Sequence, residues 1–451
     1  MTATAIPRER RAESAALDFQ TTETHVQTDP PEPSTVAAQR PAAMRFIMLT
    51  VLIDMMAIGV IVPPLPSLVG SFSASKADQA FGYSAVVFAF GIANFFGSPI
   101  LGALSDRYGR RPVLLLGFCG LALNFFATAL STALWMLIAV RLVGGAMQAN
   151  AAVANAYVAD ITPPEQRARR FGMLGAMFGL GFILGPALGG WLGDIDLHLP
   201  FFVAGSLALV NLVYGYFVLP ESLPPERRHP FEWRKANPLT SLKALAQLKG
   251  VGLLVAVVAC TGLAQFILYS TWVLYTTFKF GWTMRDNGAS LAVVGLMSVL
   301  VQGVLLGRLL KRFSPQRLAL IGLVSSTLAY ALYGASTEGW MMYAVIVVNL
   351  LGFTVAASIQ SIISSAADAR TQGQTMGSVS SLNSLMAVGG PLIGPPLLAM
   401  VSDLPHGDWR IGAPFYVCAA LQLAGLLLAW LHFRGARRAR LAAQAAAGTN
   451  A

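Results

Sequence analysis

The chain has 451 residues, of which 55% are hydrophobic and 12% are charged. Soluble domains carry about 25% charged residues, so this composition excludes an ordinary water-soluble domain. The formal net charge is +10, but the basic residues occur in small groups between apolar segments and form no long run. We therefore expect an integral membrane protein and no nucleic-acid partner.

The first 43 residues are polar and rich in Ala, Thr, Glu, Pro and Arg, without apolar periodicity. Such a composition cannot bury enough apolar surface to fold, so residues 1–43 are predicted to be a disordered cytoplasmic tail. The segment also lacks the apolar core of a signal peptide.

Twelve apolar segments follow, each close to the ~20 residues that cross a bilayer as a helix. We predict an all-α integral membrane protein whose spans lie at about 46–69, 81–103, 111–131, 134–158, 169–192, 199–219, 250–275, 287–310, 316–336, 339–364, 374–401 and 411–433. A proline-rich stretch divides them into six and six. The expected domains are a six-helix bundle at 44–219, a cytoplasmic linker at 220–249, a second six-helix bundle at 250–433 and a cytoplasmic tail at 434–451.

The basic residues predict the orientation of the spans. Lys and Arg concentrate in both ends, in the linker and in alternate connections, whereas the opposite connections hold Lys76, Lys279, Arg285 and Arg410. Because short cationic loops stay in the cytoplasm, both termini are expected to be cytoplasmic.

The connection between the second and third spans reads G-A-L-S-D-R-Y-G-R-R-P at 102–112. Its charges cannot lie in hydrocarbon, and its glycines permit close approach and a sharp turn. Asp106 can pair with Arg110 in a contact that opens and closes. The candidate gating residues are Gly102, Asp106, Arg107, Gly109, Arg110 and Arg111.

Small residues recur in the fifth span at about every fourth position, which makes a smooth helix face for close packing. Proline within this face favours a bend. The residues concerned are Gly181, Gly185, Pro186 and Gly189. From the residues alone, this pattern indicates a packing face and nothing more.

Two charges lie deep in the predicted spans, Asp54 in the first and Arg141 in the fourth. A charge at that depth is costly unless it is paired or faces a wet cavity. The two residues are therefore either a structural pair between helices or a proton-coupling site in which Arg141 tunes Asp54.

Uncharged polar residues at membrane depth are candidates for a substrate cavity, with interhelical hydrogen bonds as the alternative. The candidates are Asn94, Asn124, Gln148, Asn150, Gln265 and Gln302. The few histidines lie in the tail, in loops or at span ends, and no phosphate-binding G-x4-G-K-[ST] motif occurs. The sequence therefore predicts no enzyme, no metal, no cofactor and no ATP drive.

The 102–112 connection resembles the loop after the second helix in the major facilitator superfamily, G-x-L-[AS]-D-R-x-G-R-R-[PK]. The fifth-span pattern resembles the family's fifth-helix motif, which is associated with exporters that exchange substrate against protons. Further blocks resemble the tetracycline-efflux group of drug:proton antiporters. They are D-M-M-A-I-G-V-I-V-P-P-L-P at 54–66, A-Y-V-A-D-I-T at 156–162, L-P-E-S at 219–222, N-P-L-T-S at 237–241 and Q-G-Q-T-M-G at 372–377.

This resemblance implies roles for individual residues. Asp54 matches the family's first-helix carboxylate, Asp106 and Arg110 its gating loop, Arg141 its fourth-helix arginine and Gln302 an eighth-helix glutamine.

Three titratable positions of the family pattern hold neutral residues here, namely Asn124, Ser298 and Ser326. This departure leaves the substrate open. We expect an inner-membrane, proton-coupled exporter of small amphiphilic compounds, with tetracycline-like molecules among the candidates. An uncoupled facilitator and a non-transporting membrane sensor are the alternatives. The expected partners are the small-molecule substrate, protons and membrane lipid, and the expected state is a monomer.

Overall fold

The computed structural model describes residues 35–233, 237–238, 252–366 and 372–448. The chain divides into two compact units, Met1–Arg40 and Pro41–Ala451. The described part of the first unit is the start of helix α1 (Thr35–Val60), so the last residues of the predicted tail are helical. Residues 1–34 of that tail and residues 234–236 and 239–249 of the linker lie outside the described residues.

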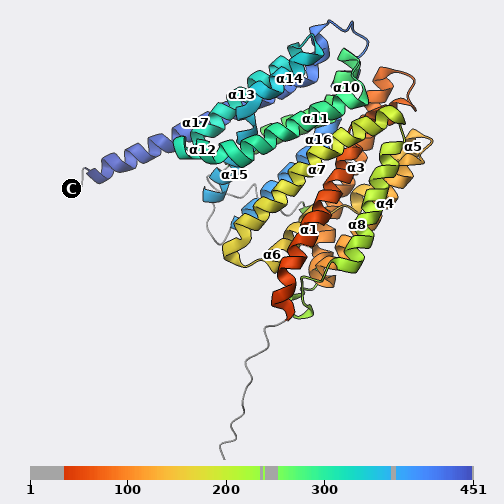
Figure 1. The fold of residues 1–451 in the computed structure, drawn as a ribbon. Helices are drawn as coiled ribbons and strands as arrows, with labels where there is room; N and C mark the ends of the chain where they lie inside the picture. The colour runs from red at the N-terminus through yellow and green to blue at the C-terminus, as the bar shows by residue number, and fades with distance from the viewer. Residues whose placement is uncertain (1–34, 234–236, 239–251, 367–371, 449–451) are drawn as a thin grey trace, which may run out of the picture. The chain divides into compact units, whose positions relative to one another are not determined.

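The described chain is helical and contains no strand in those ranges (Figure 1). Before the linker, the α-helices after α1 are α2 (Pro64–Gly70), α3 (Lys76–Tyr108), α4 (Arg110–Ala129), α5 (Leu134–Ala146), α6 (Asn150–Ile161), α7 (Arg167–Ile195) and α8 (Leu199–Val218). After it come α10 (Gly252–Phe280), α11 (Met284–Leu300), α12 (Leu306–Arg312), α13 (Pro315–Ala335), α14 (Gly339–Val348), α15 (Val355–Ala366), α16 (Gln372–Ala399) and α17 (Ala413–Gly448).

Twelve helical stretches of the described chain are long and apolar enough to cross a membrane. Six precede the linker and six follow it, which confirms the predicted all-α fold of twelve spans. The last helix, α17, continues to Gly448, so the predicted tail at 434–451 is helical over most of its length.

Four of the spans contain a break. Residues 61–63, of which the last is Pro63, separate α1 from α2, and residues 147–149 separate α5 from α6. A π-helical segment, Val301–Leu305, joins α11 to α12, and a 3-10 segment, Asn349–Thr354, joins α14 to α15. Irregular backbone at membrane depth persists where protein groups or a cavity satisfy the freed polar atoms, so these breaks indicate where such groups gather.

The connection between α3 and α4 is shorter than predicted. Helix α3 continues through the charged residues to Tyr108, and α4 begins at Arg110. Gly109 alone joins them, with φ at 106°, a conformation that favours glycine. The charged side chains therefore lie on two helix ends rather than on a flexible loop.

Helices α7 and α11 pack against each other across the two halves, from Gly193 and Met284 to Gly179 and Val299. A Cβ at Gly179 would lie 3.1 Å from the Val299 side chain, and a Cβ at Gly190 would lie 3.0 Å from the Cα of Gly288. At Gly175 and Gly303, one turn further along each helix, a Cβ would meet nothing within 4 Å. The helices diverge from that point (Figure 1).

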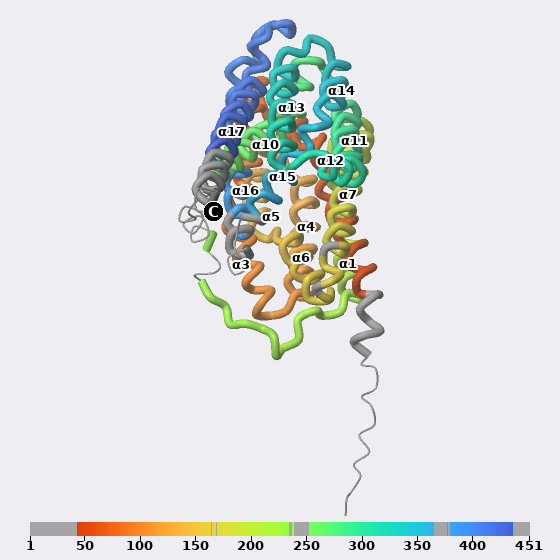
Figure 2. The backbone as a smooth tube through the Cα atoms, turned by 90° about the vertical axis from the view of Figure 1, so that its left-hand side faces the viewer, coloured from red at the N-terminus to blue at the C-terminus, as the bar shows by residue number. Residues whose placement is uncertain are grey.

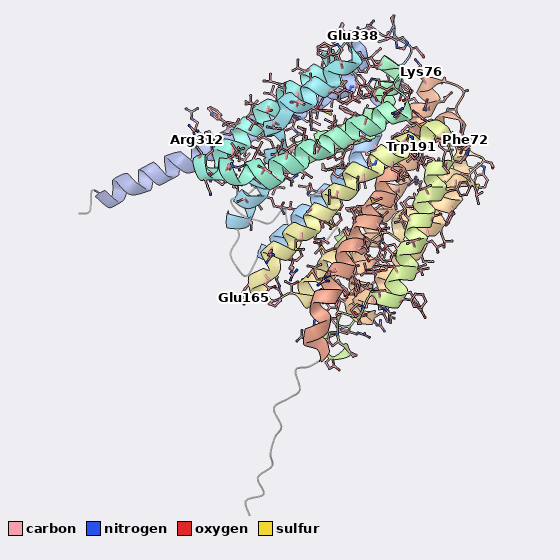
Figure 3. All side chains as sticks on the ribbon, in the orientation of Figure 1. Phe72, Lys76, Glu165, Trp191, Arg312 and Glu338 are labelled. Carbon is pink, nitrogen blue, oxygen red and sulfur yellow. The ribbon has the colours of Figure 1, made fainter. Side chains whose placement is uncertain are left out.

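Helices α3 and α16 also contact each other across the two halves over part of their length and then separate. The Ser84 hydroxyl donates to the Pro391 carbonyl across 2.6 Å, whereas Gly102 and Gly377 have open space around them. Figure 3 shows Phe72, Lys76, Trp191 and Glu338 at the end where the halves meet, and Glu165 and Arg312 towards the opposite end. The contacts between the halves are thus concentrated at the first of these two ends.

The glycine face of α7 packs directly on α1. A Cβ at Gly185 would lie 2.7 Å from the Cα of Gly59, and a Cβ at Gly181 would lie 2.5 Å from the Cβ of Met55. Backbone therefore meets backbone along this face.

We expect the substitution Gly185→Val to destabilise the protein, because the valine side chain would need α1 and α7 to separate. Overpacking of this kind costs about 1–3 kcal/mol. Thermal unfolding of the detergent-purified protein measures the effect. Gly175→Val, at an exposed site on the same helix, is the matched control. Equal unfolding temperatures for the two variants would contradict the packing role.

Candidate functional site

The Asp54 carboxylate is buried in α1 and is hydrogen-bonded to α6. Asp54 is 2% exposed, and its Oδ1 accepts from Nδ2 of Asn150 at 2.9 Å. Asn150 is the first residue of α6, so the break after α5 brings its amide to this depth. The two residues border a cavity of about 10 Å³ that Thr50, Phe118 and Phe178 also line. A space of this size holds about one water molecule.

Arg141 lies in a different cavity, and no ion pair with Asp54 forms among the described residues. This second cavity measures about 160 Å³. The structure thus separates the two buried charges that the sequence suggests as partners. The lining residues are Ile58, Ile61, Val62, Leu65, Tyr83, Val86, Val87, Phe90, Leu121, Asn124, Phe125, Arg141 and Gln148.

The six candidate cavity residues take different places. Asn124 and Gln148 line the 160 Å³ cavity, and Asn150 contacts Asp54. Asn94 instead donates to the backbone carbonyl of Gln148 at 2.5 Å, where the break after α5 leaves carbonyls without helical partners. Its amide therefore stabilises the broken span.

The remaining two candidates belong to the second half. Gln265 on α10 accepts from the Tyr330 hydroxyl at 3.2 Å. Gln302 lies in the π-helical segment, is exposed, and donates to the Ser298 hydroxyl at 2.6 Å. Neither residue lines the two cavities described above.

Arg110 is the centre of a charged cluster where α3 joins α4. Its Nη1 lies 2.5 Å from Asp106 Oδ1 and 2.6 Å from the Ser105 hydroxyl, and its Nε lies 3.1 Å from Asp160 Oδ2. Asp160, near the end of α6, also accepts from the Ser222 hydroxyl at 3.2 Å. One guanidinium thus links α3, α4 and α6. The sequence predicts the Asp106–Arg110 pair, but it gave no reason to add Asp160 from a distant span.

Glu221, at the start of the linker, is hydrogen-bonded to the same cluster. Its two carboxylate oxygens accept from the backbone N–H groups of Arg110 at 2.9 Å and Arg111 at 3.2 Å. These groups form the first turn of α4, whose N-terminus favours a negative charge. The backbone N–H of His229 donates to the Asp106 carbonyl at 3.1 Å. Figure 2 shows this linker segment as an irregular green tube close to the end of α3.

The other predicted gating residues lie at the rim of the cluster. The Arg107 guanidinium lies over the Tyr108 ring at 5.1 Å, and Arg111 donates to the Tyr216 carbonyl at 2.5 Å. Gly102 has open space around its Cα.

We expect Glu221→Ala to lower the unfolding temperature, because two N–H groups at the start of α4 lose their acceptor. Loss of a helix cap costs about 0.5–2 kcal/mol. Glu226→Ala, in the same linker segment, is the control, since Glu226 is exposed on a 3-10 turn. Differential scanning fluorimetry of the two purified variants tests the difference. If both unfold at the wild-type temperature, Glu221 has no capping role.

The fold defines the class of protein. Twelve apolar helical stretches with buried charges and small internal cavities are typical of polytopic membrane transporters rather than of enzymes. The model of the Major Facilitator Superfamily matches residues 47–391. The chain therefore belongs to the major facilitator superfamily.

Named relatives lie within the same superfamily. The chain is 36% identical over 376 residues to the class C tetracycline resistance protein of Escherichia coli, an alignment that covers 83% of this chain and 94% of the relative. It is 36% identical over 391 residues to the class D tetracycline resistance protein of Salmonella ordonez, an alignment that covers 86% of this chain and 96% of the relative. A crystal structure of the nucleoside transporter NupG superposes with a TM-score of 0.71 at 15% identity, covering 87% of this chain and 99% of that one. This last similarity concerns the fold alone.

Proposed function

We propose that this protein is a proton-coupled exporter of small amphiphilic compounds in the inner membrane, with tetracycline-like molecules among its substrates. The observation that carries the proposal is the buried Asp54 carboxylate, hydrogen-bonded to Asn150 beside a water-sized cavity. Ionisable side chains inside a membrane protein mark proton or substrate pathways. The tetracycline resistance relatives support the substrate class.

The basic connections support an orientation for the transporter. Arg110 and Arg111 lie at the end where α7 and α11 have separated, and cationic short loops stay in the cytoplasm. In this orientation both termini are cytoplasmic, and the space between the halves opens to the cytoplasm. Substrate enters from that side.

Transport then follows from a rocking movement of the two halves. The contacts of Gly190 with Gly288 and of Ser84 with Pro391 close the outer end. They separate when the cytoplasmic ends come together, which exposes the substrate to the outside. Binding of a proton to Asp54 from outside and its release inside drive the cycle.

An uncoupled facilitator is the second candidate. Asn124, Ser298 and Ser326 are neutral, and the spans of the second half hold no acidic residue except Asp286, which caps the start of α11. With Asp54 as the sole deep carboxylate, coupling depends on one group.

Accumulation of labelled compounds in inverted membrane vesicles tests the proposal. A panel that includes tetracycline is offered to energised vesicles with and without the protein. We expect at least one amphiphilic compound to accumulate, and an uncoupler to abolish its accumulation. Accumulation that an uncoupler leaves unchanged would favour the facilitator, and no accumulation of any compound would contradict export.

A further inference from the structure

The 160 Å³ cavity in the first half contains buried polar groups without partners. Arg141 is 4% exposed and Asn124 is 5% exposed. Among the described residues, Nε and Nη2 of Arg141 and both amide atoms of Asn124 make no hydrogen bond. Unpaired buried polar atoms are costly, above all on a charged group. Three of these four atoms are N–H donors, so they point to a ligand that supplies acceptors.

The position of the two side chains is fixed by close packing. A Cβ at Gly144, three residues after Arg141 on α5, would lie 2.5 Å from Cγ of Asn124. Asn124 therefore lies directly against the helix that carries Arg141. An amide and a guanidinium are presented together, a combination that suits a carboxylate, because a guanidinium binds its two oxygens through parallel N–H bonds.

The cavity carries a positive charge that its own lining does not neutralise. None of the described lining residues is acidic, and the one acidic residue that is buried among the described residues, Asp54, borders the other cavity. Apart from Tyr83, Gln148 and the two residues above, the walls are apolar. A positive charge surrounded by low-dielectric walls attracts an anion and repels a cation.

The volume limits the size of the ligand group. An apolar cavity of about 150 Å³ accommodates benzene, so 160 Å³ suits one ring-sized group. Phe90 and Phe125 supply aromatic walls for such a ring. Complete drug-sized ligands need about 300–1,000 Å³, so a larger molecule would place only one end here.

We propose that this cavity binds the carboxylate end of a monoanionic ligand with a ring-sized apolar body. Arg141 and the Asn124 amide hold the carboxylate, and the apolar walls hold the ring. The claim that this ligand is a transported substrate rests on the proposed export function. The binding itself does not.

Binding of benzoate to the full-length, detergent-purified protein tests the site, with benzamide as the neutral analogue of the same shape. We expect benzoate to bind at least about tenfold more tightly than benzamide, which corresponds to about 1.4 kcal/mol. The variant Asn124→Asp places a carboxylate in the cavity beside Arg141 and should weaken benzoate at least about tenfold. Asn155→Asp adds the same charge at an exposed position on α6 and should bind benzoate like the wild type.

Equal affinities of the wild type for benzoate and benzamide, or no binding of either, would overturn the anion site. Unchanged benzoate binding by Asn124→Asp would also overturn it. Arg141→Lys keeps the positive charge but loses the paired N–H geometry. We expect this variant to bind benzoate more weakly than the wild type but still measurably, which would show that a change in binding does not result from misfolding. Absence of benzoate binding by the wild type, alongside intact uncoupler-sensitive accumulation of another compound in vesicles, would refute this site and leave the export function standing.

Discussion

The variant Asp54→Asn is expected to lose uphill export while it still reaches the membrane. Asparagine keeps the shape of the side chain, so the contact with Asn150 remains possible, but it cannot take up and release a proton. Uncoupler-sensitive accumulation should fall to the level of vesicles without the protein. Exchange of labelled for unlabelled substrate, which needs no net proton movement, should continue.

The matched control is Asp403→Asn, which removes an exposed carboxylate from the connection before the last span. It should export like the wild type. Normal uphill export by Asp54→Asn would remove Asp54 from the coupling mechanism. Loss of both export and exchange, at normal abundance in the membrane, would show that the carboxylate serves substrate binding rather than coupling.

The variant Arg110→Gln is expected to reduce transport by about tenfold or more. Its guanidinium bridges Asp106 and Asp160 through different nitrogens, and the loss of one partner leaves the others with uncompensated charge. The Asp106 side chain is 47% exposed, so water compensates part of that loss. Initial rates of transport, corrected for protein abundance, measure the effect.

Arg110→Lys separates charge from geometry, because a lysine ammonium cannot reproduce the spread of the guanidinium nitrogens. We expect it to transport at a level between the wild type and Arg110→Gln. Arg107→Gln is the control, since the Arg107 guanidinium contacts the Tyr108 ring at 5.1 Å and forms no ion pair among the described residues. Equal activity of the Arg107 and Arg110 variants would contradict a special role for the cluster.

The sequence predicted the spans well because each is a long apolar segment, and length and hydropathy are local properties. It also identified the Asp106–Arg110 pair, whose members lie four residues apart on neighbouring helix ends. It could not place Asp160 and Glu221 beside them. Those contacts join residues 50 and 111 positions away from Arg110, so they depend on how whole helices pack.

The buried charges show the same limit. Asp54 and Arg141 are the two charges deep in the first-half spans, which suggested a possible pair, but the break between α5 and α6 gives Asp54 a different partner, Asn150. No proline lies at this break, so the sequence gives no local signal that the helix is interrupted there. Its stability rests on Asn94 from another span, a hydrogen bond that no local pattern reveals.

Substrate uptake by proteoliposomes of the purified protein, under an imposed pH gradient, tests the central claim most directly. With an acidic interior, an antiporter exchanges outgoing protons for incoming substrate. We predict accumulation above the external concentration, abolished by an uncoupler and absent when no gradient is imposed. Uptake that stops at the external concentration whatever the gradient would contradict proton coupling and identify a facilitator.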